Sequence, residues 1–134
     1  MIDFMNEIFT AVASPVRKTH PGVSMTGEYT RQPSSFPAVT LDETENVVVD
    51  RLEDSSNEET YAGVRYRLQV FSNKTSGKKA EARKIFATAD GILRQMGFRR
   101  TGYTTTPEIY ESTIYSITAI YEAIIDANGN IYKR

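Results

Sequence analysis

The 134-residue sequence predicts a single α+β domain, in which an antiparallel sheet of four to five strands carries two helices on one face. Residues 61–72 alternate apolar and polar side chains with the period of a half-buried strand, and residues 113–125 do the same. Residues 78–96, between these strands, space their apolar side chains as an amphipathic helix does. Because strands and helices do not alternate regularly, a doubly wound parallel sheet is disfavoured, and a two-layer sandwich is expected.

The helix over residues 78–96 is the element around which the rest of the chain is predicted to be organised. Gly97 is expected to end it in a left-handed conformation, and Phe98 to fold back onto its last turn. The face that includes Asp90 is predicted to be solvated. The buried stripe is predicted to consist of Ala82, Ile85, Phe86, Ala89, Leu93 and Met96.

The N-terminal third of the chain predicts a short helix followed by a hairpin. Residues 2–13 place apolar side chains on adjoining helical faces, and Pro15 is expected to stop that helix. Residues 23–31 and 38–44 are predicted to form two strands of a hairpin.

Two further strands are predicted in the C-terminal third, beside the one over residues 113–125. Residues 99–106 are expected to be extended, with Pro107 ending the strand. After a turn with Asn128-Gly129 at its centre, Ile131 and Tyr132 are predicted to pair back as a short closing strand.

Residues 42–60 are predicted to form a long acidic loop or arm, because eight acidic residues stand there against the single basic Arg51. One interpretation is a solvated loop. The other is an arm that becomes ordered only against a neighbouring subunit.

Composition excludes several classes of function. The formal net charge of −1 argues against a protein that mainly coats nucleic acid. The absence of cysteine excludes disulfides, thiolate zinc sites and cysteine nucleophiles. The single histidine, His20, is predicted to be a surface loop residue, so neither an enzyme, a metal site nor a cofactor site is expected. The N-terminus lacks the pattern of a signal peptide, and no apolar stretch approaches a membrane span, which predicts a soluble, non-secreted protein without a membrane partner.

Basic residues gather between Arg65 and Arg100, and three interpretations of them stay open. They could form a nucleic-acid surface, a merely solvated helix face, or a surface that meets the acidic segment of another copy head to tail. The basic residues are Arg65, Arg67, Lys74, Lys78, Lys79, Arg83, Lys84, Arg94, Arg99 and Arg100.

At residues 66–73, in the helix over residues 78–96, and at Gly97-Phe98, the sequence resembles the tail terminator (tail completion) proteins of long-tailed bacteriophages. The strand over residues 113–125 and the ending at residues 126–132 extend the likeness, and so do the short N-terminal helix and the start of a strand at residues 36–39. The resemblance covers most of the chain, and it includes no catalytic signature.

The resemblance implies a virion structural protein that forms a six-membered ring on the head-proximal end of the tail tube. Such a ring stops polymerisation of the tube and offers a surface for head–tail joining. The implied partners are other copies of the chain, the major tail tube protein and the head's connector, with DNA passing through the lumen without sequence-specific contact. Assembly in the cytoplasm of the host bacterium and a final location in the phage neck are the corresponding expectations.

From the residues and the resemblance together, Arg65 and Arg67 are hypothesised to lie on a subunit interface or on the lumen face. The acidic residues of the arm are hypothesised to contact the neighbouring subunit. These are Glu45, Asp50, Glu53, Asp54, Glu58 and Glu59.

Two alternatives remain beside the terminator. One is another phage neck component, a head-closure or connector protein. The other is a small nucleic-acid-binding module that uses the basic face between Arg65 and Arg100.

Overall fold

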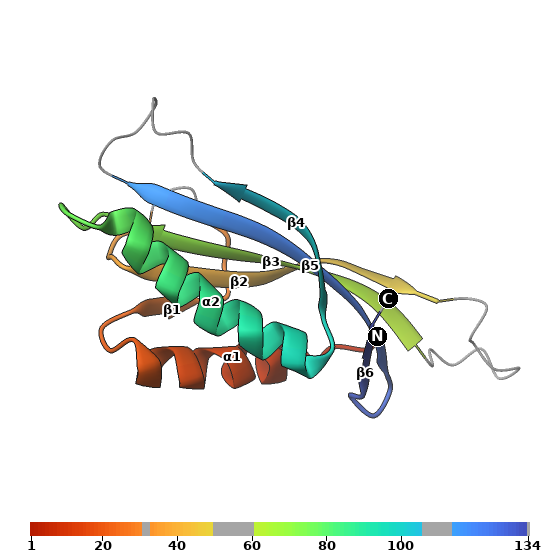
Figure 1. The fold of residues 1–134 in the computed structure, drawn as a ribbon. Helices are drawn as coiled ribbons and strands as arrows, with labels where there is room; N and C mark the ends of the chain where they lie inside the picture. The colour runs from red at the N-terminus through yellow and green to blue at the C-terminus, as the bar shows by residue number, and fades with distance from the viewer. Residues whose placement is uncertain (31–32, 50–60, 106–113, 134) are drawn as a thin grey trace, which may run out of the picture.

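The computed structural model describes residues 1–30, 33–49, 61–105 and 114–133 of the 134. Both helices lie on the same face of a single sheet, which confirms the predicted α+β class and its two layers (Figure 1). The elements in chain order are α1 (Met5–Thr19), β1 (Ser24–Thr26), β2 (Ala38–Val48), β3 (Tyr61–Ser72), α2 (Lys78–Met96), β4 (Arg99–Thr105), β5 (Tyr115–Asp126) and β6 (Ile131–Lys133).

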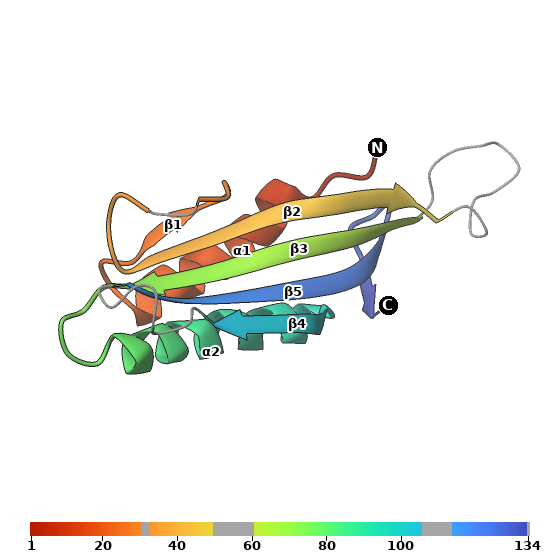
Figure 2. The same cartoon turned by 90° about the horizontal axis from the view of Figure 1, so that it is seen from above.

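The strands of this sheet follow the order β1-β2-β3-β5-β4, and β6 also pairs with β5 (Figure 2). Six strands therefore take part among the described residues, where four to five were predicted. All neighbouring strands are antiparallel except β1 and β2, which run parallel. The predicted hairpin between residues 23–31 and 38–44 is therefore wrong, whereas the closing strand after the Asn-Gly turn is confirmed by β6.

The centre of the sheet is the pair β3 and β5, whose alternation was the clearest strand signal. Tyr66 stands opposite Tyr121 in the ladder, both are fully buried, and the Tyr66 ring packs edge-on against Phe98 with centroids 5.2 Å apart. The neighbouring helix-facing side chains of both strands are also buried. They are Val64, Leu68 and Val70 in β3, and Ile117, Ala119, Ala123 and Ile125 in β5.

Helix α2 occupies residues Lys78–Met96, the range that its apolar spacing predicts. At its end, Gly97 adopts a φ of 113°, and its N–H donates to the Arg94 carbonyl at 3.1 Å. The Phe98 N–H donates to the Leu93 carbonyl at 3.0 Å. These two bonds form a Schellman motif, which satisfies carbonyls that a helix end would otherwise leave without partners.

Helix α1 does not stop before Pro15 as predicted but continues through it to Thr19. A proline inside a helix removes one backbone hydrogen bond. Val12 and Val16, on either side of it, are fully buried, and this apolar burial compensates for the lost bond.

The prediction of a loop or arm over residues 42–60 is wrong for its first part. Strand β2 continues to Val48, so Asp42, Glu43 and Glu45 belong to a strand. Acidic side chains fit there because they meet arginines and a tyrosine hydroxyl of β3, as described below. Residues 50–60 lie outside the described residues.

Replacing Gly97 by alanine is expected to destabilise the fold by about 1 kcal/mol or more. The positive φ disfavours a side chain, and a Cβ would lie 3.1 Å from Ile131 Cγ2 and 3.2 Å from the Ile131 carbonyl oxygen. Urea unfolding of the variant measures the effect.

The matched control is Gly91→Ala in the interior of α2, where a Cβ meets nothing within 4 Å. Alanine is the better helix former, so this variant should gain about 0.5–1 kcal/mol. Equal stability of the two variants would contradict the role given to Gly97.

Candidate interaction surface

The open face of the sheet, which is the face away from the helices, carries a network of charges on β2, β3 and β5. Arg65 Nη2 donates to Glu122 Oε1 at 2.9 Å, and Arg65 Nη1 lies 3.6 Å from Glu45 Oε2. The hydrogen bond to Glu122 and the charges of both carboxylates raise the pKa of Arg65. The Arg65 and Glu45 side chains are 45% and 40% exposed, so this part of the open face can be reached from solvent.

A second arginine on the same face is held more tightly. Arg67 binds Asp42 with two parallel bonds, from Nε to Oδ1 at 3.1 Å and from Nη2 to Oδ2 at 2.6 Å. The ring of Tyr29 lies 4.0 Å from the Arg67 guanidinium carbon. Bidentate pairing together with stacking on an aromatic ring fixes an arginine in one orientation.

The structure therefore brings three members of the predicted interface set, Arg65, Arg67 and Glu45, onto one face of the sheet. Both arginines already have acidic partners within the chain. Their assignment to a subunit interface or lumen stays a prediction. The other members of the set, Asp50, Glu53, Asp54, Glu58 and Glu59, lie outside the described residues.

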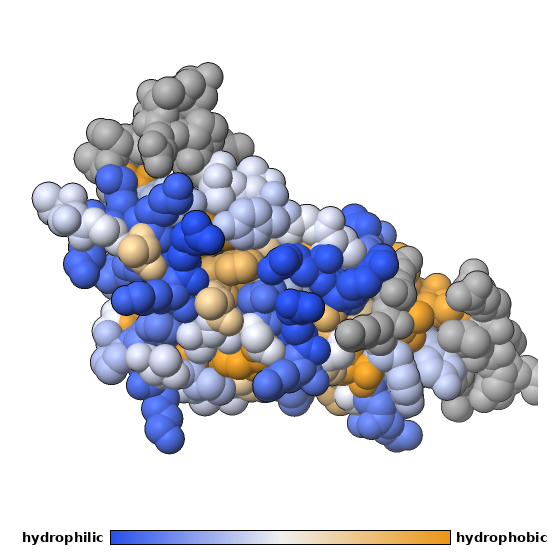
Figure 3. Space-filling view, in the orientation of Figure 1, coloured by the Kyte–Doolittle hydropathy of each residue, from blue (hydrophilic) through white to orange (hydrophobic). Residues whose placement is uncertain are grey.

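The helix layer presents a basic surface. Both of the acidic residues on and around α2 face other groups of the fold: Glu81 accepts a hydrogen bond from Ser72 at 2.7 Å, and Asp90 is buried. Hydrophilic side chains gather over the face on which α2 lies, with smaller apolar spots between them (Figure 3). The basic residues of this region are Lys74, Lys78, Lys79, Arg83, Lys84, Arg94 and Arg100.

Asp90 was predicted on the solvated face of the helix, and this prediction is wrong. The residue is 9% exposed, and its Oδ1 accepts from the Tyr121 hydroxyl at 2.5 Å and from Arg100 Nη1 at 3.1 Å. Arg94 Nη1 lies 4.0 Å from the other carboxylate oxygen. Asp90 therefore ties α2 to β5 and β4. Helical spacing alone gives no signal for this role, because the two main partners, Tyr121 and Arg100, lie outside the helix.

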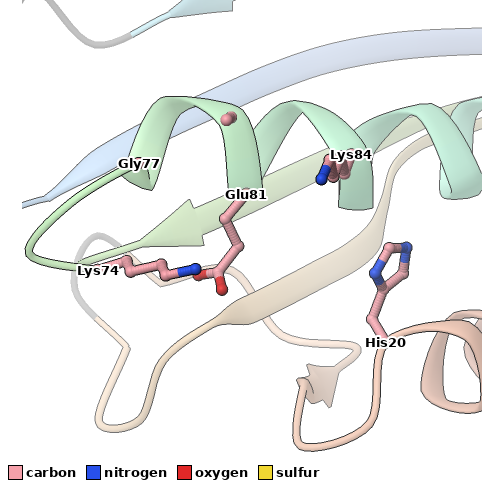
Figure 4. Close-up of a pocket in the computed structure, with 6 residues that line it drawn as sticks. His20, Lys74, Gly77, Glu81 and Lys84 are labelled. Carbon is pink, nitrogen blue, oxygen red and sulfur yellow. The ribbon is translucent and has the colours of Figure 1, made fainter.

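His20 lies at the rim of a depression of about 290 Å³ between the end of α1 and the start of α2, near Lys74, Glu81 and Lys84 (Figure 4). Its Nε2 is 2.8 Å from Thr88 Oγ1, and the Thr88 hydroxyl donates to the Lys84 carbonyl at 3.3 Å. The oxygen of Thr88 is thus left to accept from His20. This histidine joins the two helices, and it is half-buried where a surface position was predicted.

Within the described residues, no three histidine or acidic side chains come together in a way that could hold a metal ion. The same part of the chain contains no helix with both the length and the apolarity that crossing a membrane requires.

No family model matches the sequence, and no curated protein matches it. Among solved structures, the chain is similar to a chain from the virion of a native gene transfer agent (GTA) particle. The TM-score is 0.50 and the identity 11%, over 92% of this chain and 94% of that chain. The likeness shows that the two chains share a fold over most of their length.

Alkaline pH is expected to unfold the protein through two buried tyrosines. Tyr66 and Tyr121 donate to the carboxylates of Glu43 and Asp90, and burial followed by these hydrogen bonds raises both tyrosine pKa values. A raised pKa in the folded state stabilises it fully below the pKa of an unfolded tyrosine, about 10, and this contribution is lost as pH rises further. The free energy of unfolding should therefore fall above about pH 10.

Urea unfolding between pH 8 and 11.5 measures this dependence. Tyr66→Phe and Tyr121→Phe should each make the fall above pH 10 shallower, because one ionising group is removed. Tyr103→Phe, at a 49% exposed position, is the control and should leave the slope unchanged. A slope that is the same in all four proteins would refute the assignment.

Proposed function

We propose that this chain is a structural protein of a phage-like virion, and specifically the ring-forming tail terminator of its tail tube. The observation that carries the proposal is the end-to-end likeness in fold to a chain of a gene transfer agent virion, which covers 92% of this chain and 94% of that chain. Since fold alone does not define function, the proposal also relies on the resemblance of residues 66–73, 78–98 and 113–132 to tail terminators.

The proposal assigns the chain no enzymatic activity and no cofactor. His20, the one histidine of the sequence, is engaged between the helices. Among the described residues, the groups with strongly raised pKa are Tyr66 and Tyr121, and they are buried in contact with carboxylates, out of reach of a substrate. In this proposal the protein acts through the contacts that its surfaces make with other proteins.

Three contacts are proposed for these surfaces: copies of the chain with one another in a six-membered ring, the ring with the major tail tube protein, and the ring with the head's connector. The two faces of the domain differ in a way that suits such a role. The helix layer is basic, whereas the open face of the sheet pairs its arginines with acidic partners. In a ring built from such copies, the helix layer and the open face of the sheet would form two surfaces of different charge. DNA would pass through the ring without base-specific contact.

Electron microscopy of particles from a phage whose copy of this gene is interrupted tests the proposal. We expect overlong tail tubes of variable length, detached from filled heads, because nothing stops polymerisation. Complementation with the intact gene on a plasmid is the control and should restore uniform tails.

The other outcomes would contradict the terminator role in different ways. Tails of normal length lying apart from heads would assign the chain to head closure or joining. Intact virions would reject a role in the neck. The basic helix layer would then be tested for duplex DNA binding, which should weaken steeply with salt if it is real.

A further inference from the structure

Each long edge of the sheet includes a stretch that no other described strand pairs with. On one side, β1 pairs only with Ala38–Thr40 of β2, and no described strand pairs with the outer edge of residues 41–48. On the other side, β4 pairs with β5, and its second edge has no described neighbour. An unpaired edge is a template for another strand.

The two edges carry opposite charges. The open part of β2 contains Asp42, Glu43 and Glu45 and no basic residue. Strand β4 contains Arg99 and Arg100 and no acidic residue. Arg99 is exposed, and it makes no ion pair with any residue in the described part of the chain.

The registers of the sheet place these charges at the same height on both edges. Two adjacent rows cross β2, β3, β5 and β4, and each begins with a glutamate and ends with an arginine. On the open face the row is Glu45, Arg65, Glu122, Arg99. On the helix side the row is Glu43, Tyr66, Tyr121, Arg100.

Strand direction is also suitable for continuing the sheet into another copy. Because β2–β3, β3–β5 and β5–β4 are all antiparallel, β2 and β4 run in opposite directions. A second copy related by rotation about an axis along the strands keeps these directions. Its β2 would then lie antiparallel to β4 of the first copy.

Each edge also contains an irregularity, at Thr44 in β2 and at Thr101 in β4. Bulges at sheet edges discourage pairing with arbitrary strands, so an edge of this kind favours a partner matched in shape and charge.

We propose that copies of this chain join edge to edge, with residues 99–103 of β4 in one copy pairing antiparallel with residues 41–45 of β2 in the next, so that the sheet is continuous across the ring. This inference rests on the proposed ring and names its interface. In the unstaggered register, Arg99 lies beside Glu45 of the neighbouring copy. The alternation of charge along the open-face row then continues from one subunit to the next.

Disulfide trapping tests this contact cleanly, because the natural sequence contains no cysteine. The variant Glu45→Cys/Arg99→Cys is oxidised at high protein concentration and examined on a non-reducing gel, while light scattering measures the mass of the assembly. The two positions in one chain are three strand spacings apart, about 14 Å, too far for a disulfide within the chain. Any bond must therefore join two copies.

We expect a ladder of cross-linked species that collapses on reduction. The matched control, Glu45→Cys/Arg94→Cys, places the second thiol on the exposed face of α2, where Arg94 is 62% exposed, and it should give no ladder. Rings without a ladder in the first variant would overturn the edge pairing and leave the proposed function standing. A chain that stays monomeric at high concentration would also overturn the edge pairing. The tail-length experiment would then decide the proposed function separately.

Charge exchange gives a second test that does not depend on disulfide geometry. Glu45→Arg alone and Arg99→Glu alone each place like charges across the junction, and neither should assemble. A one-to-one mixture should form rings of alternating variants, because every junction then pairs an arginine with a glutamate. Rescue in the mixture also shows that both variants are folded. Native-like assembly of either variant alone, or no rescue from two folded variants, would overturn the proposal.

Discussion

Burial of one face of the β3–β5 pair is the constraint on which the rest of the structure depends. Val64, Tyr66 and Leu68 must face the helices, and since side chains alternate along a strand, Arg65 and Arg67 must face the other way. A shift of the register by one residue would bury both arginines. The same contact that builds the core therefore fixes which charged groups the open face presents, and at what height on the sheet.

The elements that the sequence predicts most accurately are those whose periodicity and end signals agree. Strand β3 and helix α2 fall in this group, with Gly97 where the helix ends. The failures occur where tertiary contacts oppose a local signal. Pro15 is tolerated inside α1 because its neighbours are buried, and an acidic composition did not reveal that residues 42–48 are strand. Composition indicates how well a segment is solvated, whereas pairing with a neighbouring strand decides whether the segment is itself a strand.

The candidate surface could be predicted only in part, for a related reason. Sequence alone places Arg65 and Arg67 on one side of a strand, because that follows from a period of two. It does not show that Glu45 and Glu122 flank Arg65, since this depends on the order of strands and on the bulge in β2. Asp90 was missed similarly. Its hydroxyl partner on Tyr121 is 31 residues away in sequence, and no local pattern connects them.

The order of charges across the sheet has a consequence for symmetry. Two copies meeting through identical edges around a two-fold axis would bring glutamates of β2 together, or arginines of β4, and like charges opposite one another are destabilising. Head-to-tail pairing avoids this, and contacts of this kind close into rings when the rotation permits. In every chain each row begins with a glutamate of β2 and ends with an arginine of β4. Opposite charges therefore meet at every junction, whatever the number of subunits. In the proposed ring, charge can therefore select the polarity, while the number of copies would follow from the angle between neighbouring sheets and from the width of the helix layer.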